Sequence, residues 1–333
     1  MAELRQNMAT KEWVIIATER AKRPDAYIEK HKPVITETQL FYDPNCPFCP
    51  GNEETELEIE RVPAHNGVWQ TRVVGNKFPA LSQEGIVTRT FDGVHRSITG
   101  VGYHEVVVEH PRHNTTLALM KPEEIKVYLQ TLYWRGWNIQ KDDRIEQVIY
   151  FKNHGSAAGA SLRHPHSQII GLPVVPNDIR RRIEEARRYF DDTGHCVYCA
   201  MLEDEVRNRV RLVALSKHFV AFVLYAAPAP FHIWIIPRKH SVSFLYSQED
   251  ELSDLSHVLR DVLRRLYVGL RDPAFNLIIR TAPAKEISND YMHWYITIVP
   301  RLARSAGFEL GSGIFINPSI PEDSAAYLRQ IKL

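Results

Sequence analysis

Long hydrophobic runs and an excess of charge of one sign are both missing from this 333-residue sequence. Its longest apolar stretches, residues 219–230 and 231–237, fall short of the roughly 20 residues that a membrane-spanning helix needs. The first residues carry no apolar signal region. Lysine and arginine number 41 against 40 acidic residues, which argues against nucleic acid or a membrane as the main partner. We therefore expect a soluble, cytoplasmic protein that binds any anionic ligand through local groups.

Cysteine is scarce as well, and its placement is informative. The four cysteines form two Cys-x-x-Cys pairs, Cys46 with Cys49 and Cys196 with Cys199. Redox pairs and structural disulfides are the alternatives, but disulfides are rare in cytosolic proteins. Such pairs are typical halves of a zinc site. Each pair then needs two further ligands.

A repeated order of elements suggests where those ligands lie. Strand-like and helix-like patterns follow one another as strand, helix, strand, loop and strand, and the series occurs twice. The first series comprises residues 103–109, 121–141, 147–152 and a strand that begins at His164. The second comprises residues 231–236, 249–270, 275–280 and 292–299. Each series is preceded by one Cys-x-x-Cys pair, so the sequence predicts an internal duplication of the chain.

Aligning the two copies predicts two metal sites. One histidine follows the first strand of each copy and another opens the last strand, with separations of 51 and 53 residues. Two cysteines and two histidines suit tetrahedral zinc with no open position, so we expect two structural zinc ions per chain. The alternative, that these histidines are ordinary core or surface residues, does not account for the matched spacing. The predicted sets are Cys46, Cys49, His113 and His164, and Cys196, Cys199, His240 and His293.

The copies differ at the position two residues after the second histidine ligand. The first copy has His166 there, whereas the second has Tyr295. Side chains at i and i+2 of an extended strand share a face, so His164 can bind zinc while His166 faces a substrate. Tyrosine, with an ordinary pKa of about 10, does not replace a neutral imidazole at pH 7. We expect one reactive residue per chain, with the second half as scaffold or pocket wall.

The residues around His166 favour phosphoryl chemistry. A neutral imidazole attacks phosphorus well and forms a labile bond, which suits group transfer. Gln168 lies on the same strand face and can donate to a phosphate oxygen, and Ser161 with the loop 155–159 offers small residues and backbone N–H groups. The loop can also be read as a tight connection only. Arg20 and Arg23 either clamp a diphosphate or form a solvated basic face.

These motifs resemble the galactose-1-phosphate uridylyltransferase family of the histidine-triad superfamily, including its plant ADP-glucose phosphorylase branch. The resemblance covers nearly the whole chain, and His-Pro-His-x-Gln with the upstream Gly-x-Ser is its most specific part. The matching segments are Arg20–Pro24, Cys46–Asn52, Asn76–Leu81, Phe151–Asn153, Gly159–Ser161, His164–Gln168, Gly307–Gly313, Ile316–Pro318 and Pro321–Asp323.

The resemblance implies an α+β fold of two fused histidine-triad-like domains, each an antiparallel β-sheet with packed helices. We expect residues 1–190 to carry the nucleophile, residues 191–333 to lack it, and the protein to be a homodimer. The implied catalytic residues are His166 and Gln168. The implied substrate-binding residues are Arg20, Arg23, Asn76, Asn153, Gly159, Ser161 and Gln168.

The implied reaction is ping-pong transfer of a nucleoside monophosphate, through a covalent nucleotidyl-histidine, between a nucleotide sugar and a sugar 1-phosphate. UDP-glucose:hexose-1-phosphate uridylyltransferase is the first expectation, with ADP-glucose phosphorylase and a dinucleoside polyphosphate phosphorylase as alternatives. Lys77 departs from the acidic residue of the best-known uridylyltransferases, and the second Cys-x-x-Cys pair is typical of the phosphorylase branch. A hydrolase and a non-catalytic, zinc-stapled nucleotide-binding protein are the competing classes.

Overall fold

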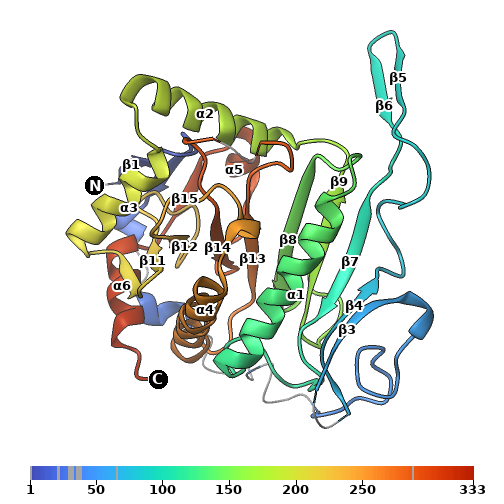
Figure 1. Ribbon diagram of the computed structural model, residues 1–333. Helices are drawn as coiled ribbons and strands as arrows, with labels where there is room; N and C mark the ends of the chain where they lie inside the picture. Colours follow the sequence, from blue (N-terminus) through green and yellow to red (C-terminus); the bar gives the residue numbers. More distant parts are fainter. Residues whose placement is uncertain (1, 21–22, 29–33, 35–39, 65–66, 287–288) are drawn as a thin grey trace.

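The computed structural model describes residues 2–20, 23–28, 34, 40–64, 67–286 and 289–333. One ten-stranded sheet runs through the molecule, and every neighbouring pair of its strands is antiparallel (Figure 1). Across the sheet the strands are β10 (Leu212–Leu215), β11 (Phe219–Val223), β12 (Ile233–Pro237), β14 (Tyr295–Pro300), β13 (Phe275–Arg280), β8 (Gln147–His154), β9 (His166–Leu172), β7 (Tyr103–Val108), β4 (Trp69–Gly75) and β3 (Glu58–Pro63).

The strand order contains the predicted duplication. From each outer edge inward, the order β3-β4-β7-β9-β8 is matched by β10-β11-β12-β14-β13, and β8 pairs with β13 in the middle. Helix α1 (Pro122–Gln140) connects β7 to β8, and α4 (Glu249–Leu270) connects β12 to β13. The two helices pack side by side on one face of the sheet (Figure 1). The expected mixture of helices and antiparallel sheet is confirmed.

Sequence patterns explain the main elements. In α4 the buried residues Leu252, Leu255, Leu259, Val262 and Leu266 recur every three or four positions, which gives the helix one apolar face. A capping box begins this helix, because the carboxylate of Glu251 accepts from the N–H of Gln248 at 2.8 Å. Strand β12 is buried throughout, as its nearly continuous apolar sequence predicts.

Helix α2 (Asn177–Thr193) connects the halves. The boundary expected at residues 190/191 falls within this helix, and one hydrophobic core contains residues of both halves. The division into two domains stays a prediction.

The remaining elements surround the sheet. Strands β1 (Glu3–Gln6), β2 (Trp13–Ile16) and β15 (Phe315–Asn317) form a small separate sheet. Strands β5 (Arg89–Asp92) and β6 (His95–Ile98) form a hairpin that projects from the molecule (Figure 1). The other helices are α3 (Val197–Asn208), α5 (Gly307–Ser312), α6 (Pro321–Gln330), and the 3-10 helices η1 (Thr18–Arg20), η2 (Pro24–Tyr27), η4 (Thr55–Leu57), η5 (Ser156–Ala158) and η6 (Phe244–Tyr246). Among the described helices, none combines the length and apolar character needed to span a membrane.

Candidate active site

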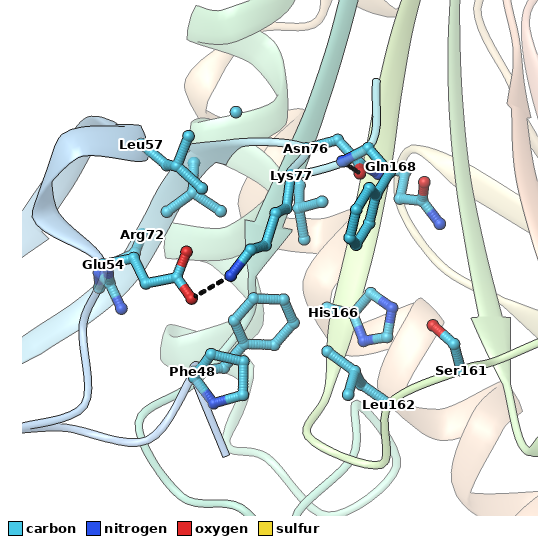
Figure 2. A pocket seen from close by; sticks show the side chains of 15 residues that line it. Phe48, Glu54, Leu57, Arg72, Asn76, Lys77, Ser161, Leu162, His166 and Gln168 are labelled. Atoms are coloured by element: carbon cyan, nitrogen blue, oxygen red, sulfur yellow. Dashed lines mark hydrogen bonds and ion pairs between the residues drawn. The ribbon is translucent and has the colours of Figure 1, made fainter. Parts of the chain in front are cut away.

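His166 is the first residue of β9 and faces a pocket of about 440 Å³ on the sheet face opposite α1. The pocket lies between strands β4, β7 and β9 and the loop that carries the first cysteine pair. Figure 2 shows His166 at one end of it, with Ser161 and Leu162 nearby. The ring of Phe48 packs against that of His166, with 5.6 Å between their centroids. Further lining residues include Glu54, Leu57, Arg72, Asn76, Lys77 and Gln168.

The local geometry fixes the protonation of His166. Its Nδ1 lies 2.8 Å from the carbonyl oxygen of His164, which can only accept a hydrogen bond, so Nδ1 carries the proton. The lone pair is then on Nε2. Burial lowers the pKa of His166 below its ordinary value, which keeps the imidazole neutral at neutral pH. A neutral nitrogen with a directed lone pair is the form that attacks phosphorus.

Gln168 lies on the same face of β9 and is oriented by His104 of β7. The Nδ1 of His104 accepts a hydrogen bond from the N–H of Ala80 at 3.1 Å, so its Nε2 carries the proton. That Nε2 lies 2.8 Å from Oε1 of Gln168 and donates to it. With its oxygen held, the amide NH₂ of Gln168 is left for an acceptor in the pocket. His104 was not predicted from the sequence, although it is the polar residue on the pocket-facing side of β7 that otherwise carries Val106 and Val108.

Asn76 and Lys77 line the same pocket. The side-chain oxygen of Asn76 accepts from the N–H of Phe78 at 2.9 Å, which fixes the turn after β4. The ammonium of Lys77 forms an ion pair with Glu54 at 2.9 Å, drawn as the dashed line in Figure 2. Lys77, which departs from the uridylyltransferase pattern, is therefore held at the rim of the pocket by an ion pair.

Ser161, Asn153 and Gly159 come from β8 and the loop that follows it. Ser161 lines the pocket. Asn153 lies outside the pocket lining and accepts from the side-chain amide of Asn276 in the second half at 2.7 Å. Gly159 directly follows η5 and has φ of +90°, a left-handed conformation that favours glycine.

Of the two arginines of the predicted basic clamp, only Arg23 has a side chain in the described part of the structure. Arg23 is exposed at the start of η2, which packs against α4 and α6 rather than against the pocket. Arg20 ends η1, and its side chain lies outside the described part of the structure. Binding of substrate by these arginines stays a prediction.

The first predicted metal set is brought together beside the pocket. Sγ of Cys49 lies 3.4 Å from Nδ1 of His113 and 3.6 Å from Nδ1 of His164, and Sγ of Cys46 lies 3.7 Å from the latter. In a tetrahedral zinc site with bonds of about 2.3 Å to sulfur and about 2.0 Å to nitrogen, the distances between sulfur and nitrogen ligands are similar to these. Nε2 of His164 donates to the carbonyl of His110 at 2.7 Å, which leaves Nδ1 for a cation. Burial lowers the pKa of His164 to about 3, so its imidazole is neutral.

The second predicted set is also assembled. Sγ of Cys199 lies 3.4 Å from Nδ1 of His240 and 3.5 Å from Nδ1 of His293. In each set, the four ligand atoms lie within 4.8 Å of one another. All four cysteines are free thiols. The chain thus has two Cys2His2 groups whose donors fit a metal ion.

At the position equivalent to His166, aromatic side chains of the second half fill the space that the pocket occupies in the first half. The ring of Tyr295 stacks on Trp234 with centroids 4.1 Å apart, and its hydroxyl accepts from Arg182 of α2 at 3.2 Å. Tyr295 is 2% exposed, and the adjacent cavity measures only about 20 Å³. This half offers no room for a substrate at that point.

Comparison with known proteins agrees with this arrangement. The family described as galactose-1-phosphate uridyl transferase, N-terminal domain, matches residues 1–176. ADP-glucose phosphorylase of Arabidopsis thaliana is 38% identical over 99% of this chain and 93% of its own length. Galactose-1-phosphate uridylyltransferase of Thermotoga maritima is 29% identical over 100% of this chain and 99% of its own length.

Solved structures show the same fold. A crystal structure of the Arabidopsis thaliana ADP-glucose phosphorylase with bound ADP-glucose superposes with a TM-score of 0.83, at 35% identity and coverage of 100% of this chain and 99% of that one. A uridylyltransferase structure gives 0.75 at 25% identity, with coverage of 99% and 97%. The relatives named above are transferases. The chain belongs to the galactose-1-phosphate uridyl transferase family.

Proposed function

We propose that the protein is a nucleotidyltransferase in which His166 carries the nucleotide. The observation that carries the proposal is the buried, neutral imidazole at the end of the pocket, with Nδ1 bound to the His164 carbonyl and the lone pair on Nε2. Gln168, two residues further on the same strand face, presents its amide NH₂. A binding module needs neither arrangement.

The reaction then has two displacements. Nε2 of His166 attacks the α-phosphorus of a nucleotide sugar, a P–N bond forms, and the P–O bond to the sugar 1-phosphate breaks, so that this group leaves with the electron pair. A phosphate oxygen of the acceptor next attacks the same phosphorus and releases Nε2. The amide of Gln168 donates to the phosphoryl oxygens as negative charge develops on them. Fixing Nδ1–H on a carbonyl holds the ring in line for both steps.

Two donors fit this chemistry. Uridylyl transfer between UDP-glucose and a hexose 1-phosphate is supported by the family match and by the Thermotoga maritima relative. Adenylyl transfer from ADP-glucose to phosphate is supported by the higher identity to the Arabidopsis thaliana relative. The substrates in either case are a nucleotide sugar and a phosphate or sugar phosphate. Either donor would place its α-phosphorus against His166 in the same pocket.

We also propose that the two Cys2His2 groups each hold one zinc ion. Four protein ligands close the coordination sphere, so the ion would stabilise the fold and leave the reaction to His166. The first group includes His164, which places the metal next to the strand that presents the nucleophile. The homodimer implied by the family resemblance stays a prediction, which the sedimentation of the purified protein can test.

A covalent adduct tests the proposal and separates the donors. The protein is mixed with UDP-glucose or with ADP-glucose, without acceptor, and its intact mass is measured. We expect one nucleotidyl group per chain from the true donor, and none in His166→Ala. His195→Ala is the matched control, because His195 is exposed in the loop between α2 and α3, and it should form the adduct normally. Absence of any adduct, with full activity in His166→Ala, would rule out the covalent route.

A further inference from the structure

A charged pair is completely buried behind His166, on the side of β9 that faces α1. The ammonium of Lys152 lies 2.8 and 2.9 Å from the two carboxylate oxygens of Glu109. Lys152 and Glu109 are each 1% exposed. Ser167 donates its hydroxyl to Glu109 at 2.5 Å, and the hydroxyl of Tyr128 lies 2.9 Å from that of Ser167. Charged side chains this deep need a reason, because the removal of ions from water is energetically costly.

The pair contacts the backbone that carries the nucleophile. Lys152 donates to the carbonyl oxygen of His166 at 3.3 Å. The backbone N–H of Glu109 donates to the carbonyl of Pro165 at 3.0 Å, and its carboxylate accepts from Ser167. Lys152 and Glu109 therefore bind three consecutive residues, 165–167, from the side of the sheet opposite the pocket. These three residues follow directly after His164, whose carbonyl fixes the His166 ring.

The second half of the chain provides an internal comparison. When His166 is aligned with Tyr295, the strand registers identify the equivalent positions. The pairs that fix the alignment are Phe151–Gln168 with Ile278–Thr297, and Val107–Ser167 with Ile235–Ile296. The equivalents are Ile279 for Lys152, Pro237 for Glu109 and Ile296 for Ser167. All three are buried and apolar. The half without a nucleophile thus builds the same strands without the charges, so the strand arrangement itself does not require them.

We propose that Lys152 and Glu109 are positioning residues for His166, which hold the backbone of residues 165–167 so that the imidazole keeps its orientation towards the phosphorus. The proposal rests on the nucleotidyl transfer proposed above. It goes beyond that function by assigning a task to groups that touch neither substrate nor metal. Misplacement of a reacting group by about 1 Å costs on the order of 100-fold in rate.

Replacing the pair by the apolar chemistry of the other half separates positioning from folding. In Lys152→Ile/Glu109→Leu/Ser167→Ala no unpaired charge is left in the core, and such replacements are often neutral for stability. We expect the metal content, the melting temperature and the nucleotide-sugar affinity to stay near wild type. The single-turnover rate of adduct formation should fall about 10- to 100-fold. A folded variant with the wild-type rate would overturn the proposal.

A second buried pair on β7 is the matched control. Glu105, which is 0% exposed, binds Arg135 of α1 at 2.6 Å. In Glu105→Leu/Arg135→Met an ion pair is removed from the strand that leads to Glu109, and we expect the wild-type rate of adduct formation. An equal loss of rate in this variant and in the triple variant would mean that any core change slows the reaction, and would contradict a specific positioning effect.

A spectroscopic measurement makes the test independent of turnover, and it is made on variants whose melting temperature and metal content show that they are folded. Nitrogen chemical shifts of His166 in the full-length protein should report the Nδ1–H tautomer in the wild type. In Glu109→Gln, which keeps the size of the side chain but removes its charge, we expect a mixture of both tautomers and a several-fold slower adduct formation. An unchanged tautomer in Glu109→Gln and in the triple variant would overturn the positioning proposal. Lack of any adduct in the wild type would overturn the proposed function instead.

Discussion

Two histidines that are two residues apart in the chain have different surroundings in the structure. His164 is bound through Nε2 to a backbone carbonyl and turns Nδ1 towards two thiols. His166 is bound through Nδ1 to the carbonyl of His164 and leaves Nε2 unprotonated. The backbone thus assigns opposite ring nitrogens to the two tasks. One imidazole suits a metal and the other suits a phosphorus atom.

Gln168 supports a quantitative prediction at this scale. Its amide is the polar donor on the same strand face as His166, so Gln168→Ala should lower the rate of adduct formation by about 10²- to 10³-fold. His104→Ala removes only the group that orients the amide, and its effect should be smaller, about 10-fold, without change in metal content. Single-turnover rates of the two variants check this order. A larger loss in His104→Ala than in Gln168→Ala would contradict the assigned orientation.

The sequence motif was sufficient to predict four of the residues that line the pocket, but not the residues that hold them in place. His166, Gln168, Asn76 and Ser161 lie in one pocket as the motif implies. His104 was missed because its contact with Gln168 depends on the register between β7 and β9, which no local pattern reveals.

The two metal groups tie different elements to the sheet, and they should differ in their effect on the reaction. The first joins the loop of residues 46–49 to the start of β9. Cys49→Ser should lower the zinc content from two ions to one and abolish adduct formation, since Phe48 and His166 then lose their fixed positions. Cys199→Ser should lower the zinc content equally but leave the adduct. Metal analysis with intact mass checks this; equal loss of adduct in both variants would show that the sites are not separable.

Arg144 holds the segment that leads into the projecting hairpin, and this contact should depend on pH. Arg144 donates to the carbonyls of Gln83 and Gly85 at 3.0 and 2.7 Å and is itself held by Asp142. The hydrogen bonds from Arg144 are the main reason why the pKa of Asp142 lies well below its ordinary value of 3.8. A carboxyl whose pKa is lowered by folding stabilises the native state above its unfolded pKa, and this contribution is lost as the pH falls.

We therefore expect Asp142→Asn to be less stable than the wild type at pH 7, with a difference in the free energy of unfolding that shrinks as the pH falls below the unfolded pKa of about 3.8. Urea denaturation of both proteins between pH 7 and about pH 2 measures this difference across the range in which the carboxyl takes up its proton. A difference that stays constant over this range would contradict the assigned ion pair.

At the scale of the whole molecule, the two halves share strand order and one helix-covered face but have diverged in chemistry. The order of elements and the spacing of the ligands were sufficient to predict the duplication. The pairing of β8 with β13, which merges the halves into one sheet, was not predictable, because this contact is between the copies and leaves no periodic signal within either. The filling of the second site by Tyr295, Trp234 and Arg182 likewise depends on how α2 folds over it.

The central claim is that His166 alone carries a nucleotide during turnover. The most direct measurement is to trap the protein with its donor nucleotide sugar and to locate the adduct by fragmentation of the modified peptide. We expect one nucleotidyl group per chain, attached to the imidazole of His166 and released when phosphate or a sugar 1-phosphate is added. An adduct on any other residue, or one that persists in His166→Ala, would contradict it.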